Sequence, residues 1–321
     1  MVPVTAQGLA PFASLRRHIG NTTLDGVTGG LIEKVFLATV EEINTEANVM
    51  TMMTQLKPST LKLATVTFGG NGSRWRTEAM RSHDTPRLIH ITKGQGRITI
   101  NGLTNGYGPN NLIFIPPNSM YGTEVGPTVF AQMLTLPNTG DWPDEPFHLR
   151  LRDVVSQKEL QSYYDSIERE LKPTGDMRAA LCHFGLLTIF VERQLQARDP
   201  NAVDARRNSA AAKLVARYTH LIARDYRKDR DVSDYATEIG VTPTHLTRCC
   251  KQTCDRSALD LLNDRIHFEA CSMLRDTRTP IQDIAKSLGF QSAAYFTRSF
   301  QNKSGQTPSD FRQGPVALNR V

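Results

Sequence analysis

Two arginines, Arg248 and Arg298, stand fifty residues apart in a pattern that the chain repeats. Each ends a short run of an apolar residue, a threonine and the arginine, at 246–248 and 296–298. A guanidinium group has several N–H donors in a planar fork, so it can grip a phosphate or contact a guanine edge with two hydrogen bonds. The alternative for either residue is a solvated surface arginine. Which of the two roles applies depends on the elements that carry the arginines.

Small residues upstream of each arginine predict what those elements are. Ala236 and Gly240 in the first copy match Ala285 and Gly289 in the second, at an offset of 49 residues. The alanines let two helices approach closely. The glycines stand where a helix ends and the chain can take a left-handed conformation.

A second helix is predicted to start directly after each glycine. Thr242 precedes Pro243, which suits the first helical position, and Ser292 suits an N-cap. Each copy therefore predicts a helix-turn-helix unit, at about 232–253 and 281–303. In proteins of this type the second helix enters the major groove of DNA.

One long helix is predicted between the two units, from Ser257 to Leu274. Its apolar residues recur at helical spacing: Leu259, Leu262, Ile266, Ala270 and Leu274. Thr279 and Pro280 are expected to start the next helix. A rigid helix would fix the separation of two units that enter successive major grooves, which repeat about every 34 Å.

The charge of the chain is concentrated in its last part. The net charge is +6, and residues 205–321 carry 19 Lys and Arg against 12 Asp and Glu, whereas residues 1–204 carry 19 against 20. We expect only the basic part to meet a polyanion, and nucleic acid is the favoured one. The alternative is a solvated basic surface.

Residues 30–136 are predicted to be β-structure. Apolar runs recur between Gly, Asn and Pro turns, which indicates an antiparallel sandwich or small barrel. The runs are Leu31–Val40, Leu61–Phe68, Arg87–Ile91, Arg97–Ile100 and Leu112–Ile115.

A helical hairpin follows, with helices at Val154–Leu171 and Met177–Leu195. The second helix has a large apolar surface, formed by Leu181, Phe184, Leu187, Phe190 and Val191. Two interpretations stay open: this surface packs on the β-domain, or part of it forms a homodimer. After the hairpin, the polar segment Ala197 to Ala212 is interpreted as a linker.

The last hundred residues resemble the DNA-binding domain of the AraC/XylS family of bacterial transcription regulators. The resemblance covers about Lys213 to Gln313 and is most specific in three stretches of the second unit, 281–290, 294–300 and 305–312. The N-terminal half resembles, more weakly, the cupin-like effector domain of this family, through 85–97 and 112–118.

This resemblance implies a multidomain α+β fold. An N-terminal cupin-like antiparallel β-barrel, the effector domain, would span residues 1–150. The helical hairpin for dimerisation would span 151–198, the linker 199–212, and an all-α DNA-binding domain with two helix-turn-helix units 213–315.

The resemblance also implies the function and its partners. The expected function is sequence-specific, effector-responsive transcription control, most commonly activation, although repression stays open. The expected partners are double-stranded DNA, RNA polymerase, a small-molecule effector and a second copy of the chain.

The residues expected to meet DNA lie on the exposed face of each recognition helix. In the first unit they are Thr244, His245, Thr247, Arg248 and Lys251; in the second they are Gln291, Ser292, Ala293, Ala294 and Arg298. Because the two alanines offer only apolar contact, we expect the first unit to supply most sequence discrimination and the second to supply anchoring. Lys251 and Lys303 are each interpreted as either a phosphate contact or a plain surface residue.

The first unit departs from the family pattern at two positions. Cys250 stands where a core Phe is usual, and Asp255 stands where a Gly is usual. Asp tolerates the left-handed conformation better than most residues, so the turn is still expected. Cys249, Cys250 and Cys254 lack the spacing of a zinc site and are interpreted as structural.

No enzyme chemistry, cofactor or metal is expected. His83 and His90 could begin a cupin metal site, but the region that should supply a further histidine reads Asn118-Ser-Met-Tyr121. The rival interpretation is a metal-free cupin-type enzyme or binding protein with a helical appendage. No apolar run approaches the roughly 20 residues that cross a bilayer, and no secretory signal is expected at the N-terminus. The five cysteines are an odd number, which fits a reducing compartment better than a set of disulfides. A cytoplasmic protein is therefore expected.

Overall fold

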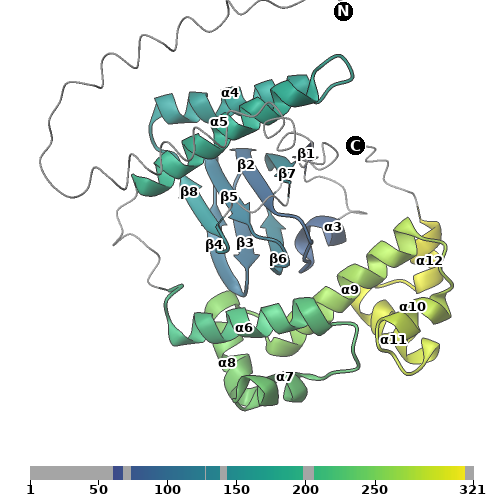
Figure 1. Cartoon of the computed structure of the whole chain (residues 1–321). Helices are drawn as coiled ribbons and strands as arrows, with labels where there is room; N and C mark the ends of the chain where they lie inside the picture. Colours follow the sequence, from purple (N-terminus) through teal and green to yellow (C-terminus); the bar gives the residue numbers. More distant parts are fainter. Residues whose placement is uncertain (1–60, 68–73, 127, 138–142, 198–205, 315–321) are drawn as a thin grey trace, which may run out of the picture. The chain divides into compact units, whose positions relative to one another are not determined.

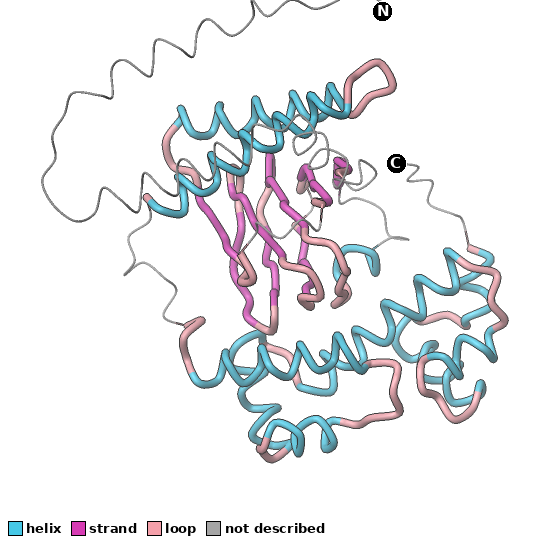
Figure 2. Tube along the Cα trace, in the orientation of Figure 1, coloured by secondary structure: helices cyan, strands magenta, loops and turns pink. Residues whose placement is uncertain are grey.

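The computed structural model describes residues 61–67, 74–126, 128–137, 143–197 and 206–314. All of them belong to one of the two units of the chain, Pro58–Val321. The segment Leu31–Val40, predicted as a strand, lies outside the described residues. Figure 2 shows the strands gathered in one region and helices making up the rest.

The β-domain contains two antiparallel sheets in the described residues. One has the strand order β1-β7-β2-β5-β8 and the other β4-β3-β6. The strands pair as two sheets and not as one closed barrel, while the antiparallel arrangement is as predicted. The elements are β1 (Lys62–Thr67), α3 (Arg74–Glu78), β2 (Arg87–Lys93), β3 (Gly96–Ile100), β4 (Leu103–Tyr107), β5 (Asn111–Ile115), β6 (Tyr121–Val125), β7 (Phe130–Thr135) and β8 (Phe147–Arg150).

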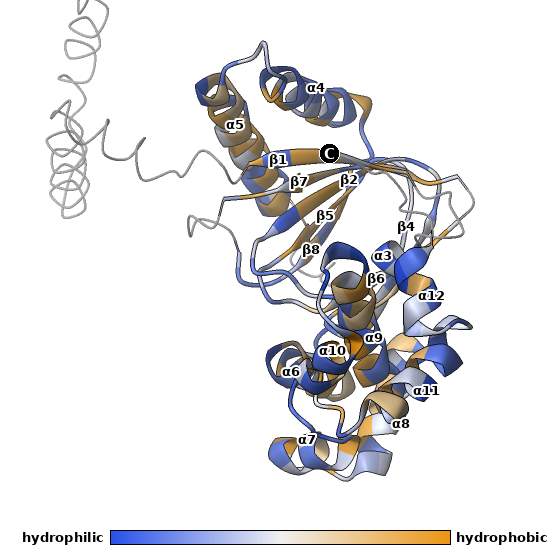
Figure 3. Cartoon of the chain, turned by 90° about the vertical axis from the view of Figure 1, so that its right-hand side faces the viewer, coloured by the Kyte–Doolittle hydropathy of each residue, from blue (hydrophilic) through white to orange (hydrophobic). Residues whose placement is uncertain are grey.

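The central strand β2 places alternate side chains on opposite faces of the larger sheet, as the pleat of a strand requires. Leu88 and Leu112 belong to a core shared with the helical hairpin. Ile89 pairs in register with Ile113 of β5 and Met133 of β7, and these three face the other sheet. The strands of the larger sheet are coloured mainly hydrophobic in Figure 3, as expected for a sheet covered on both faces.

The hairpin consists of α4 (Val154–Glu170) and α5 (Met177–Gln196), close to the predicted bounds. The N-caps Asp153 and Asp176 accept hydrogen bonds from backbone N–H groups in the first turn of each helix. The Tyr164 hydroxyl of α4 donates to the Leu88 carbonyl of β2 at 3.3 Å. The hairpin therefore lies against the larger sheet (Figure 1).

The apolar surface predicted on α5 packs on the sheet. Leu187, Phe190 and Val191 are buried in this core, and Leu181 and Phe184 are half-buried against it. Of the two interpretations left open for these five residues, packing on the β-domain is the one that the structure shows.

The rest of the described chain is all helical. Its helices are α6 (Ala210–Asp225), α7 (Val232–Ile239), α8 (Pro243–Cys254), α9 (Ala258–Asp276), α10 (Ile281–Ser287), α11 (Ala293–Ser304) and α12 (Pro308–Gln313). Helix α6 begins inside the segment interpreted as a linker, because Ser209 caps it by accepting from the Ala212 N–H. The predicted fold class, a β-domain followed by an all-α domain, is confirmed.

Helix α9 is the long helix predicted between the two units. Ser257 and Asp260 form a reciprocal capping box at its start. Its 19 residues span about 28 Å at 1.5 Å per residue. Of the apolar residues at helical spacing, Leu262, Ala270 and Leu274 are buried, whereas Leu259 is 53% exposed.

Candidate nucleic-acid interface

The first helix-turn-helix unit is built from α7 and α8. Gly240 ends α7 in the left-handed region at φ 84°, and the next N–H, of Val241, donates to the Ala236 carbonyl at 2.9 Å. Thr242 then caps α8 by accepting from the His245 N–H at 3.2 Å. The turn residues predicted from the sequence therefore adopt the expected conformations.

The second unit repeats this geometry in α10 and α11. Gly289 has φ 81°, and the Phe290 N–H donates to the Ala285 carbonyl at 3.0 Å. Ser292 caps α11 by accepting from the Tyr295 N–H at 3.2 Å. Both recognition helices therefore start with the same turn and the same type of cap.

Recognition helix α8 has a polar outer face and a buried inner face. Thr244, Arg248 and Lys251 are exposed and lie on one face at spacings of four and three residues. Leu246 and Cys250 are buried on the opposite face. The helix therefore presents three of the predicted site residues together.

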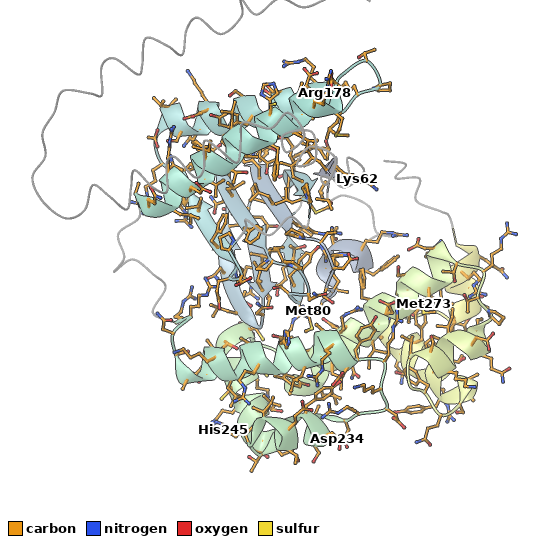
Figure 4. All side chains as sticks on the ribbon, in the orientation of Figure 1. Lys62, Met80, Arg178, Asp234, His245 and Met273 are labelled. Carbon is orange, nitrogen blue, oxygen red and sulfur yellow. The ribbon has the colours of Figure 1, made fainter. Side chains whose placement is uncertain are left out.

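Two further predicted residues of α8, His245 and Thr247, are half-buried. Arg248 Nη2 donates to His245 Nδ1 at 2.9 Å, since arginine is only a donor. His245 Nε2 lies 3.6 Å from the Cys249 sulfur. This places the Arg248 side chain over the start of α8, where a helix also favours anions. Figure 4 shows His245 and Asp234 on the side of the helical domain away from the sheets.

Recognition helix α11 presents a different set of side chains. Ala294 and Arg298 are exposed on successive turns, whereas Ala293 is half-buried against the core. The Ser292 hydroxyl is used as the N-cap. Gln291 is exposed, and its amide donates to Asp229 at 3.0 Å.

Sequence reasoning missed Tyr295 as a site residue. It is 60% exposed on the first turn of α11, three residues before Arg298. Its ring also packs on Phe290 at 5.8 Å, which holds it in place. Its spacing from Ser292 and Arg298 was the available signal, because residues three apart share a helix face. Tyrosine hydroxyls are common phosphate contacts.

The cations of this surface differ in whether carboxylates already neutralise them. In the described residues, no carboxylate pairs with Arg248, Lys251 or Arg298. Lys303, by contrast, lies 2.7 Å from Asp264, which is nearly buried. The first three are therefore the better phosphate partners.

The departures from the family pattern are accommodated locally. Asp255 follows α8 in the left-handed region at φ 57°, where Gly305 stands after α11 at φ 76°. Cys250 is completely buried, and burial raises the pKa of its thiol to about 12. A thiol in this state is a small apolar core group.

The two histidines considered for a metal site lie apart. His90 packs on Tyr164 of the hairpin at 5.2 Å between ring centroids, whereas His83 faces Phe268 of α9 at 6.4 Å. They therefore do not share a site. The described residues contain no group of three His, Cys, Asp or Glu side chains that could hold a metal ion.

A cavity of about 340 Å³ lies in the β-domain on the face of β2 opposite the hairpin. Its wall includes Ile89, Ile113 and Met133 of the larger sheet and Phe268 of α9. A cavity of this size suits a small organic molecule. Arg81, His83 and Arg87 also line it.

Two protein-family models match separate parts of the chain. Residues 235–314 match the model of a helix-turn-helix domain, and residues 65–172 match that of an AraC-like ligand binding domain. The regulatory protein SoxS of Escherichia coli strain K12 is 34% identical over 77 residues, which are 24% of this chain and 72% of SoxS. The chain belongs to the AraC family of transcriptional regulators.

Other regulators are similar to this chain over different lengths. The arabinose operon regulatory protein of Escherichia coli strain K12 is 31% identical over 84 residues, 26% of this chain. The matched part is 29% of that regulator's own length. A solved structure of ToxT from Vibrio cholerae is 13% identical and has a TM-score of 0.40, covering 82% of this chain and 98% of ToxT.

Proposed function

We propose that this AraC-family chain is a sequence-specific DNA-binding transcription regulator. The observation that carries the proposal is the pair of capped recognition helices, α8 and α11. Each exposes an arginine, Arg248 or Arg298, that no carboxylate neutralises in the described residues. The alternative of a metal-free enzyme is not favoured, because such an enzyme would have no use for two helix-turn-helix units with exposed arginines.

The direct test is selection of duplex DNA from a random pool by the full chain. We expect enrichment of a defined sequence. Its affinity should fall steeply as salt rises, because each neutralised phosphate releases counterions. Failure to enrich any sequence, or binding that is insensitive to salt, would contradict the proposal.

The proposal includes a homodimer formed through the outer face of α5. Leu186 and Ile189 are 49% and 45% exposed and lie three residues apart on this face. Leu186→Glu with Ile189→Glu should shift the full chain to the monomer in sedimentation equilibrium. Leu259→Glu, at an exposed leucine of α9, is the matched control and should leave the association unchanged. A wild-type chain that sediments as a monomer would contradict this part.

We also propose that the bound regulator activates transcription by contacting RNA polymerase in the cytoplasm, in response to a small molecule held by the β-domain. Transcription in vitro from a promoter carrying the selected site should rise when the chain is added. A decrease would assign the chain to repression.

A further inference from the structure

The cavity of the β-domain has an apolar body and a basic end. The body is lined by Ile89, Ile91, Ile98, Ile113 and Met133. The basic end carries Arg81 and Arg87, next to His83. In the described residues, no aspartate or glutamate lines this cavity.

Arg81 is held rigidly at this end. It is only 8% exposed. Its Nη1 donates to the carbonyl oxygens of Thr77 at 2.6 Å and Ala79 at 3.1 Å, and its guanidinium lies 4.4 Å over the Tyr121 ring. Backbone carbonyls and a ring face hold the group in position but do not neutralise its charge.

Arg87 is less well satisfied. Its Nη1 contacts the Met133 sulfur at 3.4 Å, a weak acceptor, and its buried Nε has no hydrogen-bond partner in the described part of the chain. A buried donor without an acceptor is destabilising. An anion at this point would supply the missing acceptor.

The pKa of the neighbouring His83 is affected by this positive charge as well as by burial. Burial lowers the pKa of His83 to about 3, and the charges of Arg87, Arg81 and Arg265 act in the same direction. His83 is therefore neutral near pH 7, so the positive charge of this end belongs to the arginines. A buried charge is expensive unless it is paired.

We propose that this cavity binds a small organic monocarboxylate, with its carboxylate at Arg81 and Arg87 and its apolar body among the isoleucines. Carboxylates match the planar donor fork of arginine and accept bidentate hydrogen bonds. The ligand is a monoanion, because the third arginine of the lining, Arg76, is already paired with Asp276. The proposal rests on the proposed function, in which it identifies the chemical class of the effector.

The same cavity touches the DNA-reading domain. Phe268, on its wall, belongs to α9, the helix between the two recognition units, and packs on Trp75 of α3 at 5.7 Å. Arg76, also on the wall, pairs with Asp276 at the end of α9 at 2.8 Å. A carboxylate bound here would therefore act on the contacts of α9, and through α9 on the positions of both recognition helices.

The test is calorimetric titration of the full chain with octanoate, decanoate and phenylpropanoate, each beside its primary amide. We expect at least one carboxylate to bind, and its amide to bind about tenfold or more weakly, because the amide loses the charge-assisted hydrogen bonds. Absence of binding by all three acids, or equal binding of acid and amide, would overturn the proposal. This comparison uses only the wild-type chain.

Variants then locate the carboxylate. Arg87→Met should weaken binding of the best acid about tenfold and leave its amide unaffected, whereas Arg178→Met, at an exposed arginine of α5, should change neither. Unchanged acid affinity in a folded Arg87→Met chain would contradict the site. DNA binding is measured separately on the ligand-free chain. If the chain binds DNA but none of the acids, the carboxylate inference alone is overturned. If it binds an acid but no DNA, the carboxylate inference is supported and the proposed function is overturned.

Discussion

The two arginines of the recognition helices give the sharpest test at the scale of single residues. Arg248→Ala and Arg298→Ala should each weaken binding to the selected duplex by about 1–3 kcal/mol if the contact is to a base. Gel-shift titration at fixed salt measures this. Arg178→Ala, far along the chain on α5, is the matched control and should bind normally. Wild-type affinity in both recognition-helix variants would show that other residues make the contacts.

The two turn glycines differ in what surrounds them, although both are left-handed. At Gly289 an added Cβ would lie 3.1 Å from the Arg227 carbonyl oxygen, whereas at Gly240 it would meet nothing within 4 Å. Gly240→Ala should therefore cost only the backbone strain, about 1 kcal/mol of unfolding free energy, and Gly289→Ala more. Urea unfolding compares the two variants, and an equal or smaller loss at Gly289 would contradict the difference in packing.

The sequence allowed these turn residues to be predicted because each has a local requirement. Positive φ selects glycine, and an N-cap selects serine or threonine. Arg81 and Arg87 could not be found in this way, because only the folding of the β-domain brings them to one end of a cavity. Tyr295 lay within a recognised motif, and only its exposure separates it from its apolar neighbours.

At the scale of elements, Asp264 joins the two helix-turn-helix units to α9. It pairs with Arg256, just after α8, and with Lys303 of α11. Only 9% of its side chain is exposed, so its ion pairs are much less screened than surface pairs. Asp264 therefore ties α11 and the segment just after α8 to the same point of the central helix.

Asp264→Asn should lower the unfolding free energy by about 2 kcal/mol, because Arg256 and Lys303 lose their shared partner. The loss is limited because the Lys303 side chain is half-exposed to water. Thermal or urea unfolding measures this. Asp276→Asn, whose partner Arg76 is about as exposed as itself, should cost only a few tenths of a kcal/mol, about the value for surface pairs. Equal losses for the two variants would contradict the role of Asp264.

Elements were predicted well where the pattern was strong and less well elsewhere. The hairpin and α9 matched because their apolar residues recur at helical spacing. Strands β4, β6, β7 and β8 were not among the predicted runs. Strand β4, which reads Leu-Thr-Asn-Gly-Tyr, is mostly polar and only partly buried. The second sheet therefore had too few predicted strands to show that the β-domain consists of two sheets.

For the molecule as a whole, three buried or partly buried histidines predict how stability depends on pH. Burial lowers the pKa of His90 and of His267 to about 4, and that of His83 to about 3. The unfolded chain takes up these protons below about pH 6.5, and the folded chain does not. Stability is therefore greatest above pH 6.5 and falls as the pH drops toward 4.

Urea unfolding between about pH 7.5 and about pH 5, a range that includes the ordinary pKa of histidine, should show this loss. His90→Gln, which keeps a neutral polar group at the position, should flatten the dependence. Asp225 adds to the loss at lower pH, because hydrogen bonds from Arg224 and Lys228 hold the pKa of its carboxyl well below the usual range. Stability that stays constant or rises on acidification to pH 5 would contradict this account.

The central claim is that one chain reads DNA with both recognition helices, and hydroxyl-radical footprinting on the selected duplex tests it most directly. Helix α9, about 28 Å long, suits two readers on one face of DNA, where the groove repeats about every 34 Å. We predict two protected segments per bound chain, about one helical turn apart. Arg248→Ala should weaken protection at one segment and Arg298→Ala at the other. A single protected segment per chain, or two segments that neither variant changes, would contradict the claim.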